Sequence, residues 1–184
     1  MNKTITSEKD ILDISKRIAS EKGLQAITMR SVAKECDVAV GSIYNYYASK
    51  NDLLIATIAS IWQEIIQDNL LQQSSGFIEN VQRLFECIQS GSKKYPFFFS
   101  LHSMSLAENG KEKGRMAMHQ YFQNIKKYLL TSLKEDKNIK KDVFNQTFQE
   151  EQFIDFVFSN LISLLLHKEQ SCDFLLIVIQ KIIY

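Results

Sequence analysis

The stretch from residue 28 to residue 54, TMRSVAKECDVAVGSIYNYYASKNDLL, constrains the fold more than any other part of the chain. Thr28 is placed to cap a short helix, because its hydroxyl can accept a hydrogen bond from an amide one turn later. Residues 36–38 interrupt the helical spacing, and a second short segment then runs from residue 40 to residue 47. Ser49 and Asp52 have the spacing of a capping box for a third helix. The pattern predicts two short helices joined by a tight turn, followed at once by a longer helix.

Two short helices of this size suit a DNA-reading motif, since the second helix must fit a major groove ~12 Å wide. Gly41 would let the backbone approach a phosphate or base edge, and Arg30 could reach a guanine. The alternative is that these side chains are solvated polar residues on two small helices. The candidate DNA-binding residues are Thr28, Arg30, Val40, Gly41, Ser42, Tyr44, Asn45, Tyr46 and Lys50.

Residues 42–54, SIYNYYASKNDLL, follow the pattern Ser/Thr, hydrophobic, Tyr, x, x, Phe/Tyr, x, x, Lys, x, x, Leu, Leu. This pattern resembles the DNA-binding domain of the tetracycline-repressor (TetR) family of bacterial regulators, and the resemblance covers about residues 7–56. The resemblance implies that Tyr44 and Lys50 bind phosphates. It also implies that four residues lie at or near bases: Arg30, Val40, Ser42 and Asn45.

The chain departs from the family pattern at three neighbouring positions. Asp37 stands in the turn where the family usually has Gly, and Asp tolerates positive φ only moderately well. Ala39 replaces the usual Ser or Thr cap of the second helix. Val40 replaces a basic or polar residue, and its apolar side chain could contact a thymine methyl group.

The scarcity of turn residues sets the fold class. The 184 residues include one proline and six glycines, too few to punctuate a series of strands, so we expect an all-α protein. The net charge of +1 does not by itself suggest a nucleic-acid partner. A localised set of phosphate contacts, however, does not require a basic protein.

The cysteines and histidines do not indicate a metal or redox site. Cys36, Cys87 and Cys172 are far apart and lack zinc spacing, so we expect reduced structural cysteines. The three histidines fall in different predicted elements, and we expect no metal and no cofactor. The N-terminus lacks an apolar signal stretch, and residues 153–166 are too short and too polar to span a bilayer. We therefore expect a cytoplasmic protein without membrane association.

The remaining pattern predicts a helix-turn-helix DNA-binding domain over residues 1–50 and a helical-bundle ligand-binding and dimerisation domain over residues 51–184. Residues 1–6 are interpreted as a loose arm, and Ser7 caps a first helix that Gly23 ends. The later helices are expected over residues 50–71, 77–94, 97–106 (begun by Pro96), 118–133, 143–168 and 172–184, with polar connections at 105–115 and 134–142.

The last two predicted helices are apolar on more than one face, as in FIDFVFSNLISLLLH and FLLIVIQKII. Such helices must be buried on several sides. They either close the core of a single subunit or form a homodimer interface, and the family resemblance implies a four-helix dimer interface. Two recognition helices ~34 Å apart would then fit successive major grooves of a palindromic operator.

Residues 77–168 are rich in aromatic side chains with a few polar ones, which is typical of a small-molecule site. The alternative for each aromatic residue is an ordinary place in the core. We expect a hydrophobic or aromatic effector that favours a conformer unable to bind DNA, so that repression is relieved, although activation is also possible. The candidate ligand-binding residues are Trp62, Phe85, Phe99, His102, Met118, Tyr121, Phe122, Phe156 and Asn160.

Two other classes of protein are alternatives to a regulator. The chain has no Gly-rich phosphate loop, no HExxH and no Glu-x-x-His pair, so we do not expect an enzyme. A helical protein-interaction adaptor without DNA binding would use the end helices as its surface. It would leave the arrangement of Ser42, Tyr44 and Lys50 without a purpose. DNA binding with a steep salt dependence, which phosphate contacts produce, would argue against both alternatives.

Overall fold

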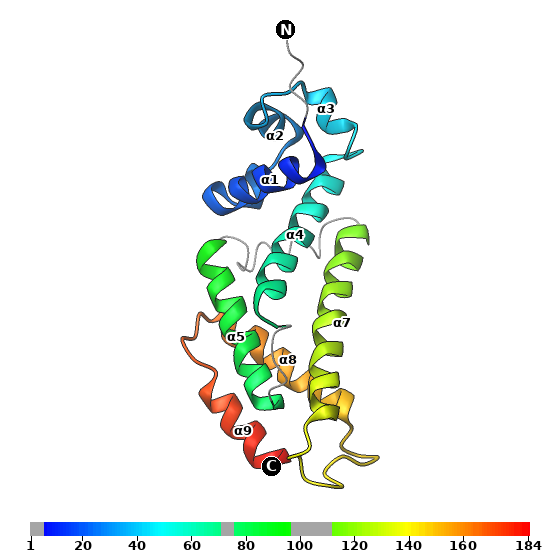
Figure 1. Ribbon diagram of the computed structural model, residues 1–184, viewed down its shortest axis with the longest axis vertical. Helices are drawn as coiled ribbons and strands as arrows, with labels where there is room; N and C mark the ends of the chain where they lie inside the picture. The colour runs from blue at the N-terminus through cyan, green and yellow to red at the C-terminus, as the bar shows by residue number, and fades with distance from the viewer. Residues whose placement is uncertain (1–5, 71–75, 97–111) are drawn as a thin grey trace. The chain divides into compact units, whose positions relative to one another are not determined.

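The computed structural model describes residues 6–70, 76–96 and 112–184, with the backbone alone at 67–70 and 112–118. In these ranges every regular element is a helix, which confirms the all-α fold class (Figure 1). The chain divides into two compact units. The first comprises residues 1–64 and 91–119, and the second comprises residues 65–90 and 120–184.

The first unit begins with α1 (Glu8–Lys22), a 3-10 turn η1 (Leu24–Ala26), α2 (Met29–Glu35), α3 (Val40–Tyr44) and the first part of α4 (Lys50–Leu70). The predicted capping box at the start of α1 is confirmed, because Ser7 and Asp10 exchange hydrogen bonds in both directions. Gly23 ends α1 with a φ of 80°, a value that glycine adopts without strain.

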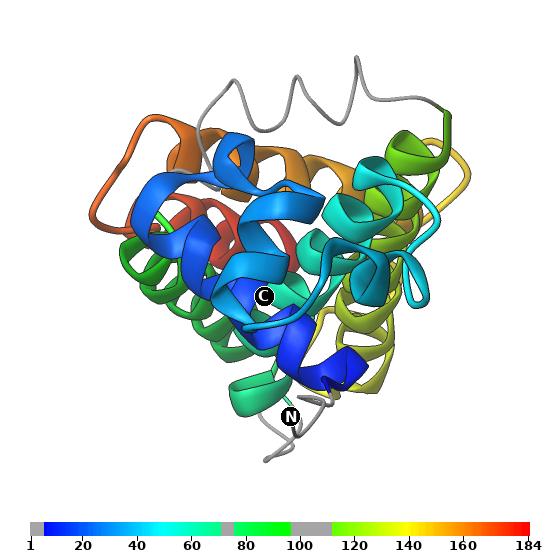
Figure 2. The same cartoon turned by 90° about the horizontal axis from the view of Figure 1, so that it is seen from above.

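The first helices pack around a small apolar core. Helix α2 contacts both α1 and α3, and the three lie together at the N-terminal end of the ribbon (Figures 1 and 2). Apolar side chains from each element are removed from water, and this burial supplies most of the stabilisation of such a small group. The fully buried members include Ile11, Val32, Ile43 and Leu53.

The second unit contains most of α5 (Phe77–Lys94) and α7 (Glu112–Glu135), together with α8 (Glu150–Leu166) and α9 (Asp173–Ile183). Phe153 of α8 lies at the centre of an aromatic cluster, with ring centroids 6.1 Å from Phe77, 5.7 Å from Phe144 and 5.6 Å from Phe148. A buried polar contact joins α5 to α7, because Asn80 Nδ2 donates a hydrogen bond to Ser132 Oγ over 2.6 Å.

Two predicted helix starts were wrong. Helix α7 begins at Glu112 and not at residue 118, so part of the predicted polar connection is helical. The glycine at 114 costs only about 1 kcal/mol in a helix otherwise made of good helix formers. Helix α8 begins at Glu150 and not at residue 143. Asn145 Oδ1 accepts the amides of Thr147 and Phe148 at 2.9 and 3.1 Å, and this local turn competes with helix formation.

The other predicted boundaries agree with the structure to within a few residues. The helix predicted over 97–106 and the arm predicted at the N-terminus lie outside the described residues, apart from Thr6. Within the described ranges, none of the helices combines the length and the apolar character needed to cross a bilayer.

Candidate nucleic-acid interface

The start of α2 is held by a capping box. Thr28 Oγ1 accepts the amide of Ser31 over 2.9 Å, and Ser31 Oγ accepts the amide of Thr28 over 2.9 Å. The Thr28 hydroxyl also donates to Ser31 Oγ, so it is already engaged within the helix start. The exposed side chain of this first turn is that of Arg30.

The turn between α2 and α3 is a Schellman motif. The amide of Val38 donates to the carbonyl of Ala33 over 3.0 Å, and the amide of Asp37 donates to the carbonyl of Lys34 over 3.2 Å. Asp37 has a φ of 53°, the left-handed conformation that usually selects glycine. Aspartate is among the few other residues that adopt it, which explains how the turn forms without the glycine typical of the family.

Helix α3 is anchored on one side and open on the other. Ile43 and the following Tyr47 are buried, whereas Tyr44 keeps 53% of its surface exposed and Asn45 is also exposed. A Cβ added to Gly41 would meet no heavy atom within 4 Å, so this end of the helix faces open space. Val40 and Ser42 are half-buried.

Tyr46 has a different environment from its neighbour Tyr44. Its hydroxyl donates a hydrogen bond to the carbonyl oxygen of Thr6 over 2.7 Å, and the Tyr47 hydroxyl reaches Glu8 Oε1 over 3.3 Å. Burial and the nearby Glu8 carboxylate raise the pKa of Tyr47, so its phenol remains a neutral donor. These two hydrogen bonds join the segment after α3 to the start of α1. They span 40 and 39 residues of sequence, and no sequence pattern predicted them.

Lys50 lies at the first position of α4, with its side chain exposed. The predicted cap beside it is confirmed, because Ser49 Oγ accepts the amide of Asp52 over 3.2 Å and donates to its carboxylate over 2.7 Å. This cap fixes the start of α4 and therefore the position of the Lys50 backbone.

The cations of the first unit fall into two groups. Arg17 of α1 forms an ion pair with Glu35 of α2 at 2.6 Å, and the hydrogen bond from its guanidinium lowers the pKa of the Glu35 carboxyl. Arg30 and Lys50 form no ion pair with any residue that the structure describes. Their positive charges are thus available to a polyanion, whereas that of Arg17 is used to join α1 to α2.

The candidate effector residues that the structure describes belong to both units. Trp62 is buried in the first unit, and Phe85 is buried in the second. Tyr121 and Phe122 are half-buried on α7, and the Phe122 ring lies 5.2 Å from that of Phe158. Phe156 is exposed, and Asn160 Nδ2 donates to its carbonyl oxygen over 2.8 Å. The side chains of Phe99, His102 and Met118 lie outside the described ones.

Two of the three cysteines are buried, and Cys36 is half-buried. No group of three or more His, Cys, Asp and Glu side chains among them could hold a metal ion. Cys87 and Cys172 are buried, and burial raises the pKa of the Cys172 thiol to about 11, which keeps it protonated at neutral pH.

A capped α2, a left-handed turn, an anchored α3 with an exposed outer face and a following long helix together define a helix-turn-helix protein. Residues 11–57 match the family model described as "Bacterial regulatory proteins, tetR family". This match confirms the resemblance inferred from residues 42–54 and identifies residues 11–57 as a region similar to the DNA-binding domain of that family.

The chain is also similar to individual proteins of known class. The transcriptional repressor KstR of Rhodococcus jostii is 33% identical over 88 residues, which is 48% of this chain and 42% of that repressor. The chain thus spans less than half of that relative. Two solved structures show the same fold over nearly the whole chain. Reduced NemR of E. coli has a TM-score of 0.71 and 13% sequence identity, and the match covers 96% of both chains. The multidrug binding protein EbrR complexed with imidazole has a TM-score of 0.64 and 17% sequence identity, and the match covers 96% of this chain and 94% of that one.

Proposed function

We propose that this chain is a DNA-binding transcriptional regulator that reads a palindromic operator as a homodimer. The observation that carries the proposal is the two-sided character of α3, with Ile43 and Tyr47 buried beneath it while Tyr44 and Asn45 remain exposed. Hydroxyl and amide groups on such a helix can contact phosphates and base edges. The similarity to a transcriptional repressor, which is 33% identical over 88 residues, supports the same function.

We propose distinct roles for the candidate residues. Tyr44 and Lys50 are assigned to phosphates, and Arg30 and Asn45 to base edges, because their side chains are exposed. Gly41 and the half-buried Val40 and Ser42 would allow close approach of the backbone. Thr28 and Tyr46 are assigned supporting roles, since both hydroxyl groups bond within the protein.

The test begins with selection of operator DNA from a randomised duplex pool by the purified full-length protein. We expect enrichment of a palindrome whose half-sites lie about one helical turn apart. Fluorescence anisotropy at several salt concentrations then compares the wild type with Tyr44→Ala and Lys50→Ala. Lys50→Ala should reduce the slope of log K against log salt by about 1.8, since a dimer loses two phosphate contacts worth roughly 0.9 each.

A matched control removes a lysine elsewhere. Lys137 is exposed in the connection between α7 and α8, and Lys137→Ala should leave both affinity and salt slope unchanged. Full retention of binding by Tyr44→Ala and Lys50→Ala would refute the assigned surface. No enrichment of any DNA would favour the adaptor alternative.

The homodimer is proposed to form through α8 and α9. Phe174 is 79% exposed on α9, and Ile177 lies three residues later on the same face of that helix. Large apolar side chains exposed together indicate an interaction surface. Analytical ultracentrifugation should show a dimer for the wild type and a monomer for Phe174→Glu. Persistence of the dimer in Phe174→Glu would place the interface elsewhere.

The effector is proposed to be a hydrophobic or aromatic small molecule that releases the protein from its operator. It would bind within a domain that spans residues 51–184, whereas residues 1–50 would form the DNA-binding domain. The aromatic side chains of the second unit support this class of ligand, as does the similarity to a multidrug binding protein. A thermal-shift screen of apolar and aromatic compounds, followed by operator release in the anisotropy assay, tests it. Binders that strengthen operator binding would indicate the opposite regulatory sign.

A further inference from the structure

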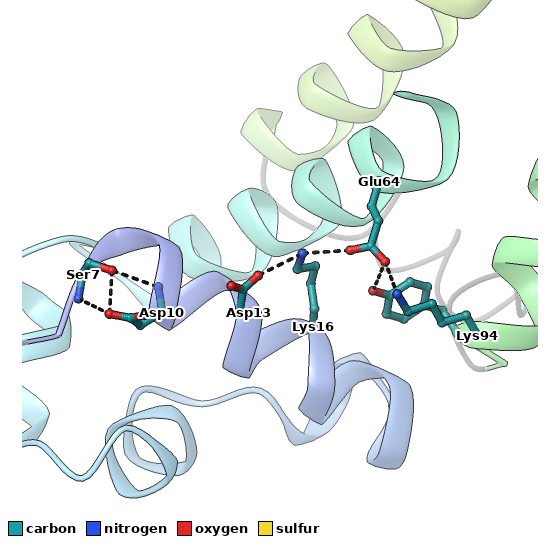
Figure 3. Close-up of polar contacts among 7 residues, drawn as sticks. Ser7, Asp10, Asp13, Lys16, Glu64 and Lys94 are labelled. Atoms are coloured by element: carbon teal, nitrogen blue, oxygen red, sulfur yellow. Dashed lines mark hydrogen bonds and ion pairs between the residues drawn. The ribbon is translucent and has the colours of Figure 1, made fainter. Parts of the chain in front are cut away.

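One carboxylate in the first unit gathers hydrogen bonds from two distant segments. Glu64 Oε2 of α4 accepts a hydrogen bond from Lys16 Nζ of α1 over 2.8 Å. Its other oxygen accepts hydrogen bonds from Lys94 Nζ, at the last residue of α5, and from the Tyr95 hydroxyl over 3.1 Å. Figure 3 shows Glu64 between Lys16 and Lys94. We call these four residues, with Asp13, the Glu64 hub.

The Glu64 hub is partly shielded from water and balanced in charge. The side chains of Lys16 and Glu64 are 18% and 24% exposed, and Tyr95 is buried. Lys16 also pairs with Asp13 at 3.1 Å, so the two lysines face two carboxylates. Partial burial strengthens the Lys16–Glu64 pair relative to fully exposed ion pairs on the surface.

A second contact fixes the same segment. The hydroxyl of Ser20 on α1 donates to the carbonyl oxygen of Lys94 over 2.6 Å. The last residue of α5 is therefore held to α1 directly through its backbone and indirectly through Glu64. Hydrogen bonds are directional, so several of them from different segments fix orientation more narrowly than apolar contacts do.

The Glu64 hub is also connected to the DNA-reading surface. Lys16 and Ser20 lie on α1, whose apolar face is buried against the helix-turn-helix, and Arg17 of the same helix pairs with Glu35 of α2. Helix α4 runs along the sequence from the first unit into the second, and α5 runs from the second unit back into the first. Within the first unit, the contacts of Glu64 thus link α1 to α4 and to the last residue of α5.

We propose that Glu64 is a positioning residue for operator binding, holding α1 to the end of α5 so that the recognition helix keeps one orientation. This inference rests on the proposed function. It assigns to Glu64 an effect on the simultaneous binding of two half-sites by a dimer, and no effect on the contacts that each α3 makes with its own half-site. A less restrained helix-turn-helix lowers the effective concentration at the second half-site.

The experiment compares wild type and Glu64→Gln as full-length proteins on two duplexes, the selected palindrome and the same duplex with one half-site scrambled. Glutamine keeps the size of the side chain but loses the charge. We expect the Kd for the palindrome to rise about tenfold, a fraction of the gain that bivalent binding provides, with the half-site Kd unchanged within about twofold. Lys94→Met should reproduce the effect. Because the Lys94 side chain is 63% exposed, we expect this variant to fold normally.

Glu21→Gln is the matched control, because Glu21 is an exposed carboxylate of α1 outside the Glu64 hub. It should change neither Kd. A double-mutant cycle adds a second readout, since Lys16→Met and Glu64→Gln should be strongly non-additive on the palindrome.

Three results would overturn the inference. Equal weakening on both duplexes by Glu64→Gln and Lys94→Met would assign the Glu64 hub to stability alone. Unchanged binding on both duplexes would show that the orientation does not depend on Glu64. A wild type that binds neither duplex would refute the proposed function itself, which separates that failure from the failure of the positioning role.

Discussion

The turn residue Asp37 offers a quantitative test of how backbone geometry limits the stability of the helix-turn-helix. Its φ of 53° brings a Cβ atom close to the backbone, which costs an L-residue about 1–2 kcal/mol. Glycine removes that cost but gives the unfolded chain more freedom, which destabilises the fold by about 0.4–1 kcal/mol. We therefore expect Asp37→Gly to raise the free energy of unfolding by about 0.5–1 kcal/mol.

Urea unfolding followed by circular dichroism measures this difference through the midpoint at constant m-value. Asp37→Ala is the matched control, because alanine keeps the Cβ and lacks the carboxylate, and it should give no stabilisation. Lys168 occupies the equivalent position after α8 with a φ of 58°, so Lys168→Gly should stabilise at least as much. A less stable Asp37→Gly, or an equal gain from Asp37→Ala, would refute the assignment of backbone strain at this position.

Three further predictions concern stability. Burial opposes ionisation of Glu64, but hydrogen bonds from Lys16 and Lys94 outweigh this effect and lower the pKa of its carboxyl from 4.5 to about 2. The stability that the ionised carboxylate contributes is therefore complete above about pH 4.5 and is lost as the pH falls toward 2. Allowing for solvent screening, wild type should lose about 1–2 kcal/mol more than Glu64→Gln between pH 6 and pH 3 in urea titrations, and parallel curves would contradict this. Phe153→Ala should cost about 3–5 kcal/mol in thermal unfolding, because it empties the centre of the aromatic cluster, and a loss below about 1 kcal/mol would show that the cluster collapses around it. Asp136→Asn should cost about 1–2 kcal/mol, since the carboxylate accepts the Tyr184 hydroxyl and the Phe77 amide, while Asp142→Asn in the exposed loop should be neutral.

The N-terminal motif could be predicted in detail because its signals are local. The caps at Ser7, Thr28 and Ser49 each act over three residues, and all three are confirmed. The turn at Asp37 was located despite a residue atypical of the family, since the spacing of apolar residues on either side defined it. Exposure of the α3 side chains likewise follows from helical periodicity.

The starts of α7 and α8 were less accessible. Gly114 and the polar residues around it resembled a connection, but a helix tolerates one glycine when its neighbours favour the helix. Asn145 fits a helical spacing by position, yet its side chain forms a turn with Thr147 and Phe148. In both cases a local competition of about 1 kcal/mol decided the boundary, and periodicity does not resolve differences of that size.

The sequence by itself determined the helical class, the caps, the left-handed turn and the surface of α3, because each depends on residues within a few positions of one another. Only the tertiary structure decided that the Tyr46 hydroxyl turns back to Thr6, and that Glu64 joins segments 30 to 48 residues away. Those contacts form only when the chain closes on itself. Their partners are then chosen by how the helices pack, and no short-range pattern in the sequence encodes that choice.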